Sequence, residues 1–153
     1  MKVFISYSTN DFTLVSRIAD HIRPHSEVLY WDNNKVPGKE AWPLIFSWID
    51  KSDLVLVVIT DNTISRAMSV GQEVGHAKAK QKMIIPIVTP NVSETDLGFL
   101  SGIIYQRIEH DNPGPALQAV ERVILSKKHA IESQQAIFLI FGVLGLILLA
   151  SNE

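Results

Sequence analysis

Short apolar runs separated by polar stretches mark this chain as one that builds a β-sheet. The runs at 53–60 and 83–88 are apolar at nearly every position. Such runs are typical of parallel strands that are buried on both faces of a sheet. The predicted strands lie at residues 3–7, 28–31, 53–60, 83–88 and 103–108.

Between these runs, apolar residues recur every three or four positions, which is the spacing of an amphipathic helix. In the clearest case Leu14, Ile18 and Ile22 share one face, and Pro24 ends the segment. Strands that alternate with helices indicate an α/β fold. We therefore expect a five-stranded parallel flavodoxin-like sheet of order 2-1-3-4-5, with helices on both faces. The predicted helices lie at residues 12–22, 42–49, 69–81, 93–100 and 115–127.

The end of the chain has a different character. Residues 136–150 read AIFLIFGVLGLILLA and carry no charge. As a helix this run would span about 22 Å, less than the roughly 30 Å hydrocarbon core of a bilayer, but it is apolar on every face. Lys127 and Lys128 precede it, and basic residues favour the cytoplasmic side. We expect a domain at 1–130 and a hydrophobic C-terminal helix at 131–153 that tethers this cytoplasmic domain to the inner face of the cell membrane. The alternative is a buried or self-associating helix.

Composition narrows the class of protein. The chain has 153 residues, of which 46% are hydrophobic and 20% charged, so a disordered chain is excluded. A formal net charge of −2 gives no electrostatic reason to expect nucleic acid as a partner. The absence of cysteine excludes disulfide scaffolds and thiol nucleophiles. The sequence contains no Gly-rich dinucleotide fingerprint, no P-loop and no HExxH, and we expect no metal site.

In an open α/β sheet, ligands bind where the strand order reverses, at the carboxyl ends of the strands. For the expected order, this point lies between the loops at 7–11 and 60–69. Ser69 and Gln72 have the spacing of a capping box, which predicts a helix that begins at Ser69. Glu73 then falls in the first helical turn, where the helix dipole favours an ionised carboxylate. The alternative for Glu73 is an ordinary solvated glutamate at a helix start.

Taken together, several stretches resemble the TIR-domain family, in particular its small prokaryotic members. The match runs in order over about residues 2–90, and more loosely to about residue 128. Two positions depart from the family pattern: Ala67 replaces the usual serine and Ser69 the usual tryptophan before the glutamate. The matching stretches are VFISYS at 3–8 with Asp11, WD at 31–32 with PG at 37–38 and Trp42, SDLVLVV at 52–58, QEVGHA at 72–77 and KMIIPI at 82–87.

The resemblance implies an enzyme that cleaves NAD at the nicotinamide–ribose bond, with NAD as substrate and no cofactor. Glu73 would be the catalytic carboxylate that stabilises the oxocarbenium-like ribose. A paired acid is unnecessary because nicotinamide leaves as a neutral amine. The implied substrate-binding residues are Phe4, Ser6, Tyr7, Ser8, Asn10, Lys35, Trp42 and Ser69.

Individual roles within that set differ. Asn10 would meet a phosphate at a helix start, and Lys35, with Lys39, would pair with the pyrophosphate. Trp42 would stack on a ring, or else serve as a core or loop anchor. The loop lysines could equally be solvated surface residues.

The resemblance also implies self-association through TIR surfaces and the loop after the second strand (the BB loop), and a role in antiviral defence as effector or signal generator. A downstream effector that senses the product is a further expected partner. Two other functions stay open at this point. The chain could be a non-enzymatic adaptor, or a related ribosyltransferase acting on another nucleotide.

Overall fold

The computed structural model describes residues 1–31, 41–64, 67–109 and 111–150, giving only the backbone for Ala67 and for 139–150. Five strands form one parallel sheet in the order β2-β1-β3-β4-β5, as predicted. They are β1 (Lys2–Ser6), β2 (Glu27–Tyr30), β3 (Leu54–Ile59), β4 (Met83–Val88) and β5 (Gln106–Arg107).

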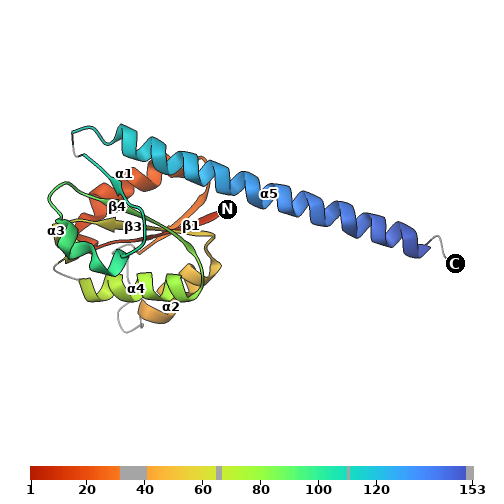
Figure 1. Cartoon of the computed structure of the whole chain (residues 1–153), viewed down its shortest axis with the longest axis horizontal. Helices are drawn as coiled ribbons and strands as arrows, with labels where there is room; N and C mark the ends of the chain where they lie inside the picture. Colours follow the sequence, from red (N-terminus) through yellow and green to blue (C-terminus); the bar gives the residue numbers. More distant parts are fainter. Residues whose placement is uncertain (32–40, 65–66, 110, 151–153) are drawn as a thin grey trace.

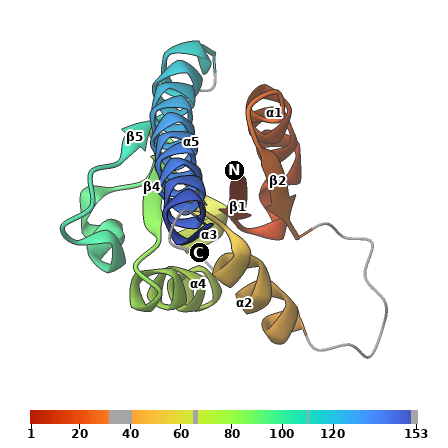
Figure 2. The same cartoon turned by 90° about the vertical axis from the view of Figure 1, so that its right-hand side faces the viewer.

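Helices cover both faces of this sheet, which confirms the predicted α/β architecture (Figures 1 and 2). The helices α1 and α5 lie on one face, and α2 and α4 lie on the other. The α-helices are α1 (Phe12–Ile22), α2 (Ala41–Lys51), α3 (Asp61–Ile64), α4 (Ala67–Ala79) and α5 (Gly114–Ala150), and the 3₁₀ helices are η1 (Thr9–Asp11) and η2 (Glu94–Leu100).

The core consists of two layers separated by the sheet. All six residues of β3 are buried, as the continuous apolar run predicts for a central strand. Along β1, Val3 and Ile5 pack toward α1 and α5, whereas Phe4 packs toward α2 and α4. Because side chains alternate along a strand, Ser6 lies on the same side as Phe4. The last residue of β1 therefore faces the helix that carries Glu73.

The fifth strand is much shorter than expected. The sequence predicts a strand at 103–108, but only Gln106–Arg107 pairs with β4. Gly102 adopts a left-handed conformation with φ of +80°, and the Ile103 amide donates to the Leu100 carbonyl. This turn leaves Ile104 almost fully exposed, so its apolar character does not reflect burial in the sheet.

The last predicted helix and the predicted hydrophobic helix form one continuous element, α5 (Gly114–Ala150). Residues 116–141 contain neither glycine nor proline, so the sequence supplies nothing that would end the helix near residue 128. The second half of α5 projects beyond the body of the domain (Figure 1). On this part Ile137 and Phe138 are exposed.

Within the described part of the chain, no helix combines the length and the apolar character needed to cross a membrane. The predicted anchor at 136–150 falls mainly on 139–150, whose side chains are outside the described set. The division into a domain at 1–130 and a segment at 131–153 remains a prediction.

Candidate functional site at the carboxyl ends of the strands

A pocket of about 200 Å³ opens beside the carboxyl end of β1, between α2 and α4. This is the point at which the strand order reverses, where ligands bind in open α/β sheets. Glu73 is the one acidic residue among the described lining residues. The pocket is lined by Tyr7, Ser8, Thr9, Trp31, Ala41, Trp42, Ile45, Ser69, Val70 and Glu73.

Glu73 is buried, with 8% of its surface exposed, and no ion pair reaches it among the described residues. Burial raises the pKa of the Glu73 carboxyl to about 7, and the nearby Ser6 hydroxyl offsets part of that rise. This corrects the expectation of an ionised carboxylate in a first helical turn. Helix α4 begins at Ala67, so Ser69 lies inside it and does not cap it, and Glu73 lies beyond the first turn. Desolvation therefore outweighs the helix dipole, whose effect fades within one turn.

Two serine hydroxyls near Glu73 are buried without a hydrogen-bond partner among the described residues. They are the Oγ atoms of Ser6 and Ser8. The Ser6 hydroxyl influences the Glu73 carboxyl by proximity, but the two groups do not meet hydrogen-bond geometry. Buried hydroxyls are usually paired. Of the two residues, Ser8 lines the pocket, so its hydroxyl is available to a ligand that carries hydroxyl or carboxamide groups.

The pocket brings together five of the residues implied by the TIR resemblance: Tyr7, Ser8, Trp42, Ser69 and Glu73. Ser6 is not among the lining residues, but its hydroxyl lies next to the Glu73 carboxyl.

Other residues of the predicted set lie elsewhere. Phe4 is in the core, where its ring packs 6.4 Å from that of Trp48, and Asn10 is exposed outside the lining. Lys35 and Lys39 fall in the segment 32–40, outside the described residues. Among the described residues, no group of three or more His, Asp or Glu side chains could hold a metal ion.

Aromatic side chains form the wall of the pocket opposite α4. The Tyr7 hydroxyl donates to the Trp31 carbonyl, which fixes the end of β2 against β1. The Trp31 ring in turn lies 5.9 Å from Trp48. Sequence reasoning had not placed Trp31 in the site, although its position directly after β2, beside the carboxyl end of β1, was a usable signal.

A buried polar network fixes the loop that follows β1. Asp11, only 9% exposed, accepts hydrogen bonds from Thr60 Oγ1 at 2.6 Å and from Asn62 Nδ2 at 2.7 Å. It thereby joins η1 to the end of β3 and the start of α3. The loop that carries Ser8 and Thr9 is thus held at one end by the Tyr7 hydrogen bond to Trp31 and at the other end by Asp11. Sequence reasoning missed this network, because its members are about 50 residues apart.

Replacing Asp11 by alanine is expected to lower the free energy of unfolding by about 2 kcal/mol. The Thr60 hydroxyl, which is buried, would lose its acceptor, and a buried donor without a partner costs about 1–3 kcal/mol. Urea unfolding measures the effect. Thr13→Ala, at an exposed position of the adjoining α1, is the control and is expected to change stability by less than about 0.5 kcal/mol. Equal stabilities for the two variants would contradict a supporting role for the network.

The fold and the site define an α/β domain of flavodoxin-like strand order in which a buried carboxyl group, that of Glu73, lines a pocket at the switch point. A family model described as TIR domain matches residues 3–124, and the chain therefore belongs to the TIR-domain family. A search of curated proteins found no match.

Two solved structures illustrate the likeness of fold. One is that of the TIR domains of the activated Roq1 resistosome that recognises the pathogen effector XopQ. It is 15% identical, has a TM-score of 0.52 and covers 90% of this chain and 76% of that chain. The other is the CMP N-glycosidase BcmB of Clostridium botulinum. It is 16% identical, has a TM-score of 0.55 and covers 79% of this chain and 99% of that chain. At these identities the likeness concerns the fold.

Proposed function

We propose that this TIR domain is a nucleotide N-glycosidase that cleaves the nicotinamide–ribose bond of NAD. One observation carries the proposal: Glu73 is a buried carboxyl group, without an ion-pair partner among the described residues, in a pocket at the switch point of the sheet. Burying an ionisable group is costly, so structural carboxyl groups are generally paired. A strongly perturbed pKa in a cleft is characteristic of functional sites.

The chemistry requires only one carboxylate. As the C–N bond breaks, its electron pair moves to the ring nitrogen, and nicotinamide leaves as a neutral molecule. Positive charge develops on the ribose, where the Glu73 carboxylate would stabilise it. Water then attacks the ribose carbon and releases a proton. A cationic pyridinium ring in the pocket would itself lower the pKa of Glu73 and favour the charged form.

The dimensions of the pocket suit the nicotinamide riboside part of NAD. Its volume of about 200 Å³ is below the roughly 300–1,000 Å³ of typical small-molecule sites. Trp42 and Tyr7 offer aromatic surfaces for the ring, and the Ser8 hydroxyl offers a partner for polar groups. The described lining contains no lysine or arginine, so the pyrophosphate would lie outside, where Lys35 is the predicted partner.

We further propose that assembly of several copies, with the BB loop of a neighbour, completes the site, and that the activity serves prokaryotic antiviral defence. The support is family membership together with the likeness to TIR domains of a resistosome. An adaptor role without catalysis is the competing interpretation. An adaptor would have no use for the buried carboxyl group of Glu73, which has no ion-pair partner among the described residues.

A second substrate class is favoured by the pKa of Glu73. A pyrimidine base, such as that of CMP, leaves more readily if it accepts a proton. A carboxyl group that is still largely protonated near pH 7 could donate one. The likeness to a CMP N-glycosidase points in the same direction.

The test is incubation of purified protein, at low and high concentration, with NAD and with CMP. Release of nicotinamide or cytosine is measured by mass spectrometry between pH 5.5 and 8.5. For NAD we expect kcat/KM to rise with pH through about 7, because ionised Glu73 is the active form. For CMP we expect it to fall above about 7, because protonated Glu73 is needed. Absence of turnover on both, at every concentration, would favour the adaptor.

A further inference from the structure

The pocket is built between two helices, so its width depends on how α2 lies against α4. Ala41, Trp42 and Ile45 of α2 form one wall. The other wall is contributed by α4 through Ser69, Val70 and Glu73. Any contact that sets the distance between these helices therefore also sets the distance between Trp42 and Glu73.

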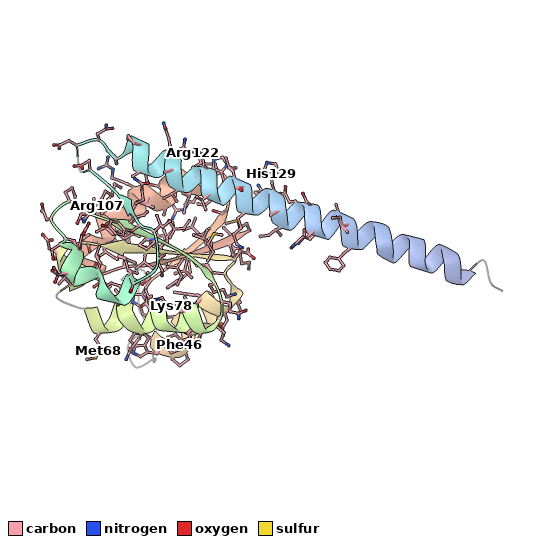
Figure 3. The ribbon with its side chains drawn as sticks, in the orientation of Figure 1. Phe46, Met68, Lys78, Arg107, Arg122 and His129 are labelled. Atoms are coloured by element: carbon pink, nitrogen blue, oxygen red, sulfur yellow. The ribbon has the colours of Figure 1, made fainter. Side chains whose placement is uncertain are left out.

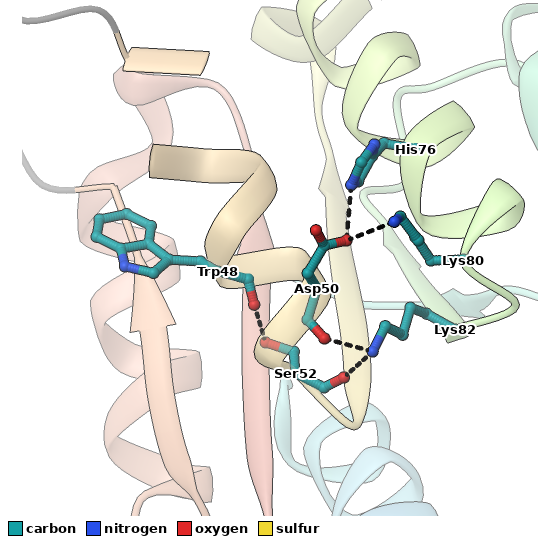
Figure 4. Close-up of polar contacts among 6 residues, drawn as sticks. All are labelled: Trp48, Asp50, Ser52, His76, Lys80 and Lys82. Carbon is teal, nitrogen blue, oxygen red and sulfur yellow. Dashed lines mark hydrogen bonds and ion pairs between the residues drawn. The ribbon is translucent and has the colours of Figure 1, made fainter. Parts of the chain in front are cut away.

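Such a contact exists one helical turn beyond Glu73. The His76 ring of α4 stacks on Phe46 of α2, with ring centroids 4.3 Å apart and planes inclined by 14°. Phe46 in turn packs against Trp42, with centroids 5.5 Å apart. The same histidine places its Nε2 2.9 Å from Oδ1 of Asp50 (Figure 4). His76 is therefore held on α2 by one aromatic and one polar contact.

Positive charges from the segment between α4 and β4 reinforce this arrangement (Figure 4). The Lys80 Nζ lies 3.7 Å from the same Oδ1 atom of Asp50. The Lys82 Nζ donates to the backbone carbonyls of Asp50 and Ser52, at 2.7 and 2.8 Å, and so caps the end of α2. The hydrogen bond with His76 is the main cause that lowers the pKa of the Asp50 carboxyl.

We infer that His76 and Asp50 are positioning residues, which hold the Trp42 wall of the pocket at its working distance from Glu73. The inference rests on the proposed function of this pocket. The side chain of Asp50 is 43% exposed, and ion pairs at such exposure contribute little to stability. The principal effect of the contacts that His76 makes with Asp50 and Phe46 is thus on the orientation of α2. Phe46 of α2, labelled in Figure 3, lies where α2 meets α4 and stacks there on His76.

Steady-state kinetics on NAD with His76→Ala and Asp50→Ala tests this inference. We expect KM to rise about tenfold and kcat to change less than about threefold, because a displaced wall weakens ground-state and transition-state binding alike. Asp50→Asn keeps an oxygen that can accept from His76 and is expected to restore most of the wild-type KM. Glu27→Ala, which removes a similarly exposed ion pair with Lys2 at the start of β2, the end of that strand away from the pocket, is the control and should leave KM unchanged.

A spectroscopic measurement separates this inference from the proposed function. In protein labelled with fluorotryptophan, Trp42→Phe assigns the ¹⁹F resonance of Trp42. That resonance should shift in His76→Ala and Asp50→Ala, return toward its original position in Asp50→Asn, and stay in place in Glu27→Ala. If the wild type turns over no nucleotide, the proposed function fails and the ¹⁹F shift alone decides the inference. An unmoved Trp42 resonance, an unchanged KM, or equal effects in the control would overturn it.

Discussion

Glu73→Gln is expected to lower kcat for the cleavage of NAD by about 10²–10³-fold. The amide keeps the size of the side chain but carries no negative charge when the ribose becomes cationic. Loss of one preorganised electrostatic group at a developing charge typically costs about 10²–10³-fold in kcat, and Glu73 is the one acidic group in the described lining. Product release, measured by mass spectrometry at matched protein concentrations, gives the value.

The control for this experiment is Glu132→Gln, an exposed position on α5 remote from the pocket. Its rate should equal that of the wild type. Binding of NAD to Glu73→Gln should change little, because the interaction that is lost operates mainly in the transition state. Undiminished turnover in Glu73→Gln would mean that the reaction takes place elsewhere in the molecule.

The same variant is expected to unfold with a pH dependence different from that of the wild type. In the unfolded chain the Glu73 carboxyl releases its proton near its ordinary pKa of 4.5, whereas in the folded protein it keeps the proton to about 7. Between these values the folded state binds more protons, so stability falls as pH rises, and it levels off above about 7. Glutamine does not titrate and escapes this loss.

Relative to the wild type, Glu73→Gln should therefore gain about 3 kcal/mol between pH 4 and pH 8. At pH 4 the carboxyl is protonated in both states and contributes no difference of this origin. Urea unfolding of both proteins at half-unit steps measures the gap, and its change with pH, rather than its absolute size, is the test. A gap that is constant from pH 4 to pH 8 would show that Glu73 has an ordinary pKa.

The architecture of the sheet could be predicted from the sequence because burial on both faces leaves a continuous apolar run. β4 was predicted to span 83–88 and is Met83–Val88. The same reasoning failed for β5, because Ile103 and Ile104 do not pair in the sheet: Ile103 packs against the core from outside the strand, and Ile104 is exposed. A local pattern cannot reveal that Gly102 turns the chain away first.

The site could be predicted only in part. The order of the strands indicated which loops meet, and the family resemblance singled out Glu73, which does lie at that point. The raised pKa could not be foreseen, because it results from packing α4 against β1 and α2. The roles inferred for Asp11 and His76 likewise depend on partners from distant segments: Thr60 and Asn62 for the first, Phe46 and Asp50 for the second. A pattern within one segment contains no information about such contacts.

The direction of α5 gives the molecule two distinct ends, one with the pocket and one with the end of this helix. This helix starts at the end of the domain that holds the pocket and leaves past the opposite end, where β1 begins (Figure 1). Residues 131–150 extend roughly 30 Å at 1.5 Å per residue. Anything joined to the far end of α5 is thus kept behind the domain, with the pocket facing away from it. Immobilising the protein through that end would present the mouth of the pocket to the solution.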